Sequence, residues 1–159
     1  MSQKELEKRR KHSEYIEAQI QTVVDYLEDE CDIAVEFGGK LNAFFYDDEL
    51  ITISNRQSPT SKLFTLLHEA GHYLLREQYD QFPVRPNKRE PKSYRIDVLH
   101  EEFLAWDRGL ELASELGLMI NDEDWRKITH KHLYDYISWA KNPKDFRRKH
   151  VKEKNVNTA

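Results

Sequence analysis

The chain has 159 residues and a formal net charge of −4, which fits a single domain and gives no indication of overall nucleic-acid binding. Apolar residues make up 38%, and no run approaches the about 20 apolar residues that a membrane-spanning helix needs. The polar N-terminus lacks the apolar segment of a secretory signal, and Cys31 is the single cysteine, so we expect no internal disulfide and a cytoplasmic protein.

The first predicted element is a helix near the N-terminus. Residues 1–12 are nearly all charged or polar, and we expect this end to fray. From Tyr15 to Leu27 the apolar residues recur at helical spacing. The pattern predicts a helix that buries one face from Tyr15 onward, and we place the single folded domain at residues 13–140.

Three short strands follow the first helix. The pairs Gly38-Gly39 and Asp47-Asp48 predict turns, and they separate three runs with the composition of strands. The runs are residues 33–37, 42–46 and 50–54. Their short spacing predicts a small three-stranded sheet, either antiparallel or mixed.

The sheet leads into a central helix. Ser58 can cap this helix and Pro59 fits its first turn, so the helix is predicted from there to about Glu77. Residues 80–95 then hold three prolines and many charges. This composition predicts a long loop, of the kind that is often functional or mobile.

The remaining elements are helical. A second long helix is predicted from Ile96 to Leu116, where Gly117 ends it. Another helix begins after the cap Asn121 and continues to Asn142. One helix, a small sheet and then further helices predict an α+β fold.

The C-terminal tail, residues 141–159, has seven basic and two acidic side chains and therefore carries +5. One interpretation is a solvated, flexible end. The other is an electrostatic contact with nucleic acid or an acidic partner. Salt-dependent DNA binding that is lost on truncation at Lys141 would support this second interpretation.

The stretch from Phe64 to Glu77, FTLLHEAGHYLLRE, carries His68 and His72 four residues apart, with Glu69 directly after the first. This spacing puts both imidazoles on one helix face, where they can bind one metal ion. Glu69 lies about 100° around the helix from His68, so it is badly placed as a ligand of the same ion. It can still reach a water bound to that ion and act as general base.

The alternative is an ordinary amphipathic helix that carries two histidines by chance. The surrounding leucines favour the metal site, because they indicate a buried helix in which two histidines need partners. Gly71 also needs a reason, since glycine inside a helix costs about 1 kcal/mol relative to alanine. A close approach by another helix would supply that reason.

A zinc site of this type needs a third protein ligand and keeps its fourth position for water. The second long helix can be drawn as a helical wheel with Leu99 at 0° and about 100° per residue. On this wheel Glu102 lies at about 300°. Glu101 lies at about 200°, on the side away from Leu99, and is expected to be an exposed charge. The predicted core-facing stripe is Phe103, Trp106, Leu110 and Ala113. Glu102 lies beside this stripe between the small residues Ala105 and Gly109, which let that face approach the histidine-bearing helix at Gly71. This placement predicts that Glu102 is the ligand. A chance boundary residue is the alternative.

Three segments of the chain, LITIS, SPTSKLFTLLHEAGHYLL and EEFLAWDRGLELA, resemble the ImmA/IrrE family of small zinc metallopeptidases, within the gluzincin group. The resemblance covers roughly Ile33 to Leu116. Its HExxH part is specific for zincins, whereas the part from Glu102 to Ala105 is weaker. The segment AWDRGLELA, followed by LYDYISWA, resembles phage-encoded members of the family, which would act in a host cytoplasm. The resemblance implies a minimal zincin-like domain, with an N-terminal helix, a three-stranded sheet, the HExxH helix and a glutamate-bearing helix.

Motif and resemblance together predict a zinc metallopeptidase with one Zn²⁺ per chain, held by His68, His72 and Glu102. Glu69 is the predicted general base, and the substrate is a protein or peptide. The strand at residues 50–54 is expected to be a sheet edge that aligns the substrate by backbone pairing. A residue that stabilises the oxyanion is also expected. The candidates are Tyr94, His100, His130 and Tyr134.

Two other functions are open. One is a zinc-containing regulatory or interaction protein that cleaves nothing. Loss of Glu69 would be its sign in the sequence, and Glu69 is present. The other is a nucleic-acid-associated protein that acts through the basic tail.

Overall fold

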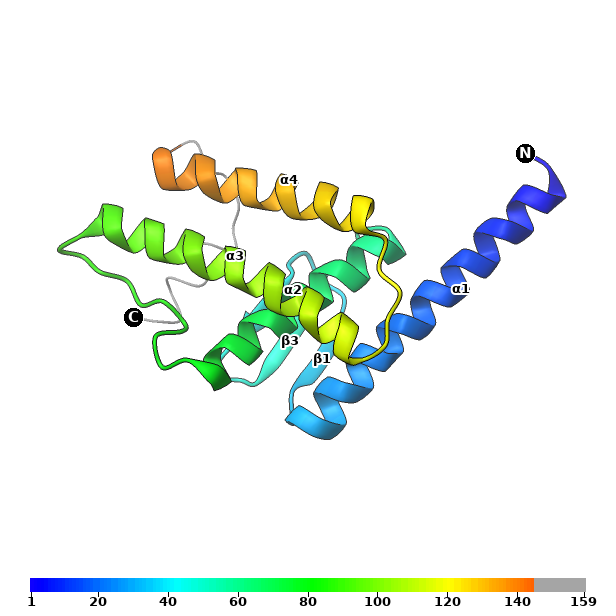
Figure 1. The fold of residues 1–159 in the computed structure, drawn as a ribbon, viewed down its shortest axis with the longest axis horizontal. Coiled ribbons are helices and arrows are strands. Elements are labelled where there is room, and N and C mark those ends of the chain that lie inside the picture. The colour runs from blue at the N-terminus through cyan, green and yellow to red at the C-terminus, as the bar shows by residue number, and fades with distance from the viewer. Residues whose placement is uncertain (145–159) are drawn as a thin grey trace.

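The computed structural model describes residues 1–144 and shows an α+β fold, as the sequence predicts (Figure 1). The elements in chain order are α1 (Gln3–Asp25), a π-helical turn η1 (Tyr26–Glu30), β1 (Ala34–Phe37), β2 (Ala43–Phe45), β3 (Leu50–Ile53), α2 (Pro59–Gln78), α3 (Pro91–Glu115) and α4 (Asp122–Lys141). Most of the predicted basic tail, residues 145–159, lies outside the described residues. In the part of the chain that is described, no helix is both long and apolar enough to cross a membrane.

Helix α1 begins at Gln3, well before Tyr15, where the apolar pattern starts. Ser2 and Glu5 form a capping box, and ion pairs one turn apart lie along the exposed half. The helix therefore extends into the segment that was expected to fray, because caps and local ion pairs can support a helix that buries nothing. This first half projects away from the rest of the molecule (Figure 1), and the buried residues of α1 all follow Tyr15.

The sheet is mixed, with the strand order β1-β3-β2. Strand β1 runs parallel to β3, and β2 runs antiparallel to it. Gly38 and Gly39 have positive φ and turn the chain as predicted, but the turn does not close a hairpin between β1 and β2. Because β3 pairs on both sides, the expectation that residues 50–54 form a sheet edge is wrong. The two edges are β1 and β2.

Helix α2 is the buried centre of the fold. It starts after the cap Ser58 with Pro59 in its first turn, as predicted, and every residue from Leu63 to Leu75 is buried. The helix packs against strands β2 and β3 and also against α1, α3 and α4 (Figure 1). Burial on all sides explains why apolar residues surround the histidines instead of following one stripe.

Helices α2 and α3 meet backbone to backbone at two glycines. A Cβ atom on Gly71 would collide with the carbonyl oxygen of Ala105, and one on Gly109 would lie 2.5 Å from the carbonyl oxygen of Leu67. Such contacts leave no room for a side chain at either position. The close approach predicted at Gly71 is therefore confirmed, and it sets the distance between the two helices.

The loop before α3 is shorter than predicted. Helix α3 begins at Pro91 rather than Ile96, because proline in the first helical turn loses no intrahelical hydrogen bond. The loop is therefore residues 79–90. The later boundaries are as predicted, since Gly117 has a φ of 69° after α3 and Asn121 caps α4.

Candidate metal centre

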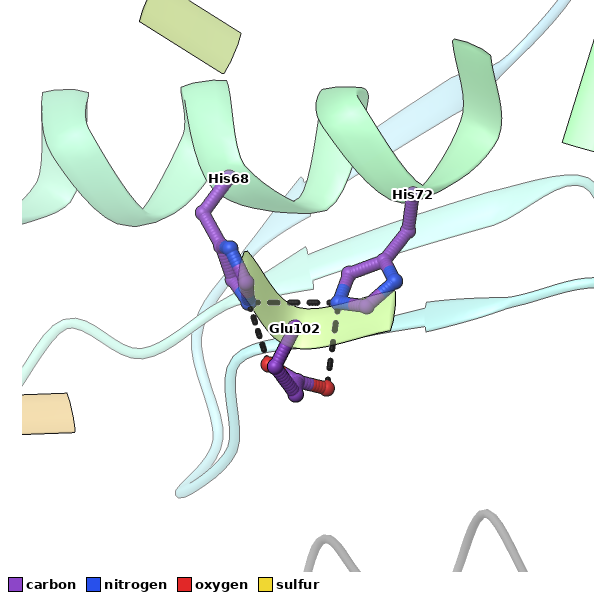
Figure 2. Close-up of side chains that lie close together, drawn as sticks. All are labelled: His68, His72 and Glu102. Carbon is purple, nitrogen blue, oxygen red and sulfur yellow. Dashed lines mark hydrogen bonds and ion pairs between the residues drawn. The ribbon is translucent and has the colours of Figure 1, made fainter. Parts of the chain in front are cut away.

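His68 and His72 project from α2 toward Glu102 on α3 (Figure 2). The Nε2 atoms of the two histidines lie 3.2 Å apart. Glu102 Oε2 lies 3.0 Å from His68 Nε2, and Glu102 Oε1 lies 3.3 Å from His72 Nε2. All three side chains are buried. The structure thus brings together the three residues that the sequence nominated as ligands, in a group able to hold a metal ion.

The geometry of this cluster suits a metal ion. Two nitrogens at about 2.0–2.1 Å from a tetrahedral zinc ion lie about 3.3 Å apart. The observed separation of the two Nε2 atoms, 3.2 Å, is close to that value. Two imidazole nitrogens and a carboxylate that face one another in a buried site also repel unless a proton or cation lies between them. Two histidines and one carboxylate form a ligand set that zinc uses in hydrolytic sites.

Glu101 forms a hydrogen bond with the other ring nitrogen of His72, Nδ1. His72 Nδ1 lies 2.9 Å from Glu101 Oε1. Because an ionised carboxylate can only accept, Nδ1 donates, and Nε2 of the neutral ring carries the lone pair. The lone pair is therefore directed at the cluster, in the tautomer that a metal ligand of this kind requires.

The structure corrects the expectation that Glu101 is an exposed charge, since the residue is only 6% exposed. The Tyr46 hydroxyl donates to Glu101 Oε1 at 2.8 Å, and the Val84 N–H donates to Oε2 at 2.9 Å. Burial raises the pKa of Tyr46 well above its ordinary value, and the charge of Glu101 adds to this, so the phenol keeps its proton. Together with His72, these donors offset the cost of burying the carboxylate.

The helical wheel misplaced Glu101 because it took the large apolar residues as the centre of the buried face. On the same wheel, the buried residues of α3 span an arc from about 200° to about 340°. The middle of this arc lies at Ala105 and Gly109, where α3 touches the backbone of α2. Phe103, which was predicted to face the core, is 43% exposed as a result, whereas Trp106 is buried as predicted.

The ring of His68 lies against Trp106. The two rings are stacked, with centroids 4.3 Å apart and an angle of 22° between their planes. Burial lowers the pKa of His68 below its ordinary value, although the hydrogen bond and charge of Glu102 act in the opposite direction. The imidazole is therefore neutral at pH 7, the form that offers a lone pair to a metal.

Glu69 lies beside the cluster and is not part of it. The residue is 4% exposed, and its charge acts on His68, Tyr46 and Tyr136. Its Oε2 atom is buried and has no hydrogen-bond partner within residues 1–144. A buried carboxylate with an available oxygen next to the cluster is well placed to accept a proton.

The predicted candidates for an oxyanion-stabilising residue occupy other surroundings. His100 and His130 are exposed, and Tyr134 is 69% exposed. Tyr94 packs edge-on against Trp139, with ring centroids 6.3 Å apart. Exposure distinguishes His100, His130 and Tyr134 from the buried side chains of the cluster.

Tyr136 on α4 was not among the residues predicted from the sequence; it is 3% exposed and hydrogen-bonds to the Glu102 carboxylate. Burial raises its pKa well above the ordinary value, and the charges of Glu102 and Glu69 add to this. The signal available in the sequence was its position three residues from both Leu133 and Trp139, on one stripe of a helix. A buried tyrosine hydroxyl usually has a partner.

Fold and site together define a small α+β protein with a buried HExxH helix and a cluster able to hold one metal ion. Residues 29–143 match the model of the peptidase M78 family, described as the IrrE N-terminal-like domain. The match covers well over half of the chain and includes every residue of the cluster, and the protein belongs to this family. The resemblance stated from the motifs is thereby confirmed. No curated protein and no solved structure matches the chain.

Proposed function

We propose that the protein is a zinc-dependent peptidase. The observation that carries this proposal is the convergence of the two Nε2 atoms and the Glu102 carboxylate beside a further buried acid, Glu69. His68, His72 and Glu102 would hold one Zn²⁺ per chain. When bound, such an ion lowers the pKa of its water and polarises the scissile carbonyl.

Glu69 is the proposed general base. Its Oε2 atom can take a proton from a water at the cluster and return that proton to the leaving amine. Glu69 follows His68 directly in the sequence, so its side chain points about 100° around the helix from that of His68. Glu69 therefore does not compete with the histidines to coordinate the metal ion. The two neutral imidazoles and one carboxylate leave the loaded site with a net charge of about +1, which favours negative charge on a bound carbonyl.

Tyr136 is the proposed donor to the oxygen of that carbonyl. Its hydroxyl lies at Glu102, and its raised pKa means that it stays protonated at neutral pH. A neutral phenol can donate a hydrogen bond to a developing oxyanion without adding charge to the site. This assignment replaces the four candidates from the sequence.

The proposed substrate is a protein or peptide in extended conformation. Because β3 is paired on both sides, an added strand can pair only with β1 or β2. Strand β2 leads into Tyr46, whose hydroxyl bonds to Glu101 next to the cluster. We therefore assign substrate pairing to the free edge of β2.

We further propose that the protein acts in a cytoplasm. Cys31, partly buried and not in a disulfide, is compatible with a reducing compartment. The resemblance to phage-encoded members would make this the cytoplasm of a host, and that origin stays a prediction.

The test combines zinc content with a screen for peptide cleavage. Protein purified without added metal should contain close to one zinc per chain, and a chelator should remove it. Glu69→Gln should keep the zinc but lose about 10²- to 10⁴-fold in cleavage, because it removes a base and not a ligand. Glu77→Gln, at an exposed position of the same helix, is the matched control.

Three outcomes of this test are informative. Unchanged cleavage in Glu69→Gln would contradict the role of the base. A folded chain that refuses zinc would contradict the metal site. A chain that binds zinc but cleaves no peptide in the screen would favour the regulatory or interaction protein.

A further inference from the structure

We propose that Glu101 is a positioning residue that couples the metal-binding His72 to the loop of residues 79–90. The proposal rests on the metal site of the proposed function. It adds that the occupancy of this site and the placement of the loop depend on one another. The loop holds two prolines and many charges, and the proposed reaction gives it no role.

The two oxygens of the Glu101 carboxylate bond to different parts of the fold. Oε1 accepts from His72 Nδ1 at 2.9 Å and from the Tyr46 hydroxyl at 2.8 Å. Oε2 accepts from the N–H of Val84 at 2.9 Å. One buried group thereby touches the metal-binding helix, the segment after β2 and the loop.

Apolar contacts attach the loop at the same place. Phe82 is 5% exposed and lies in a cluster with Leu75 of α2 and Ala105 of α3. Val84 packs against this cluster as well. The following residues, 85–90, are mostly exposed. The loop is thus fixed near the site at Phe82 and Val84, and Glu101 supplies the polar part of that attachment.

Sharing one carboxylate makes the two partners interdependent. When Nε2 of His72 serves a metal, the ring cannot turn, so Nδ1 stays on Oε1 and Glu101 keeps Oε2 in place for Val84. Conversely, an attached loop holds Glu101 where it fixes the tautomer of His72. Two binding events that share a group are linked in both directions, so zinc should order the loop, and the loop should favour zinc.

The first measurement is the zinc affinity of Glu101→Gln, determined by competition with a chromogenic chelator. The glutamine amide has one oxygen that accepts and one NH₂ group that only donates. Either the His72 N–H or the Val84 N–H would therefore face a second donor and lose its hydrogen bond. We expect zinc affinity to fall by about 10- to 100-fold, with helical circular dichroism retained. Glu111→Gln, at a position of α3 whose side chain is 68% exposed, should bind zinc like the unaltered chain.

The second measurement is amide hydrogen exchange in the loop, with and without Zn²⁺. In the unaltered chain the Val84 amide should exchange more slowly when zinc is present, relative to amides of β3. In Glu101→Gln this dependence on zinc should disappear. The comparison within the unaltered chain needs no variant, so it decides the proposal even if Glu101→Gln fails to fold.

The outcomes separate this proposal from the metal site itself. If the unaltered chain takes zinc but Glu101→Gln binds it equally well, the positioning role is wrong and the metal site stands. An exchange rate of Val84 that is the same with and without zinc likewise overturns the coupling alone. An unaltered chain that binds no zinc overturns the metal site, and this proposal with it.

Discussion

Helices α2 and α3 both supply side chains to the cluster, but the sequence reveals their contributions unequally. On α2, His68 and His72 share a face because they are four residues apart, whatever the rest of the fold does. On α3, Glu101 and Glu102 are adjacent in the sequence. Which of the two side chains faces α2 depends on how α3 is rotated about its own axis. Spacing within one helix can therefore be read locally, whereas the rotation of a helix requires knowledge of its contacts.

The structure uses both acids of α3 on the same histidine. Glu102 Oε1 lies 3.3 Å from Nε2 of His72, and Glu101 Oε1 lies 2.9 Å from its Nδ1. Adjacent residues on a helix point about 100° apart, so two consecutive acids can reach the two nitrogens of one ring. This arrangement places two carboxylates in the interior. It explains why donors surround Glu101 and why the cluster at Glu102 favours a cation.

A large loss of stability is expected when the contact that sets the rotation of α3 is disrupted. Gly71→Ala should lower the free energy of unfolding by about 3 kcal/mol, at the upper end for overpacked positions, because the obstacle is the backbone of Ala105. This loss should outweigh the gain of about 1 kcal/mol in helix propensity. Chemical denaturation measures it, with Ser114→Ala at an exposed position of α3 as control. A Gly71→Ala protein as stable as the original would show that the helices do not meet as described.

A second prediction extends the comparison to α4, which supplies Tyr136. Tyr136→Phe should reduce peptide cleavage by about 10²-fold, the size typical for loss of one oxyanion donor. Zinc affinity should fall much less, because the hydroxyl is not a ligand. Tyr134→Phe, two residues earlier and 69% exposed, should leave both quantities unchanged. Equal cleavage by the two variants would remove Tyr136 from the proposed mechanism.

The same distinction between local and tertiary information explains what could be predicted from the sequence. The cap Ser58, the stop at Gly117 and the spacing of the two histidines depend on neighbouring residues, and the structure shows them where they were expected. The central place of β3 depends on how three strands assemble, and strand composition does not carry that order. The small residues Ala105 and Gly109 correctly indicated the face that approaches α2, but the wheel could not show that this contact, rather than the stripe of larger apolar residues, lies at the middle of the buried arc.

The smallest predicted effect tests the rotation of α3 most directly. The wheel centred on large apolar residues places Phe103 and Trp106 together in the core, where truncation of either to alanine would cost about 3–5 kcal/mol. The structure separates them, since Phe103 is 43% exposed and Trp106 is 1% exposed against His68. Phe103→Ala should therefore lower the free energy of unfolding by no more than about 1 kcal/mol, while Trp106→Ala should cost the full core value. Denaturant unfolding of both variants without zinc measures the difference and leaves metal affinity out of the comparison. Similar losses for the two would mean that α3 is rotated toward Phe103, and Glu101 would then turn away from His72.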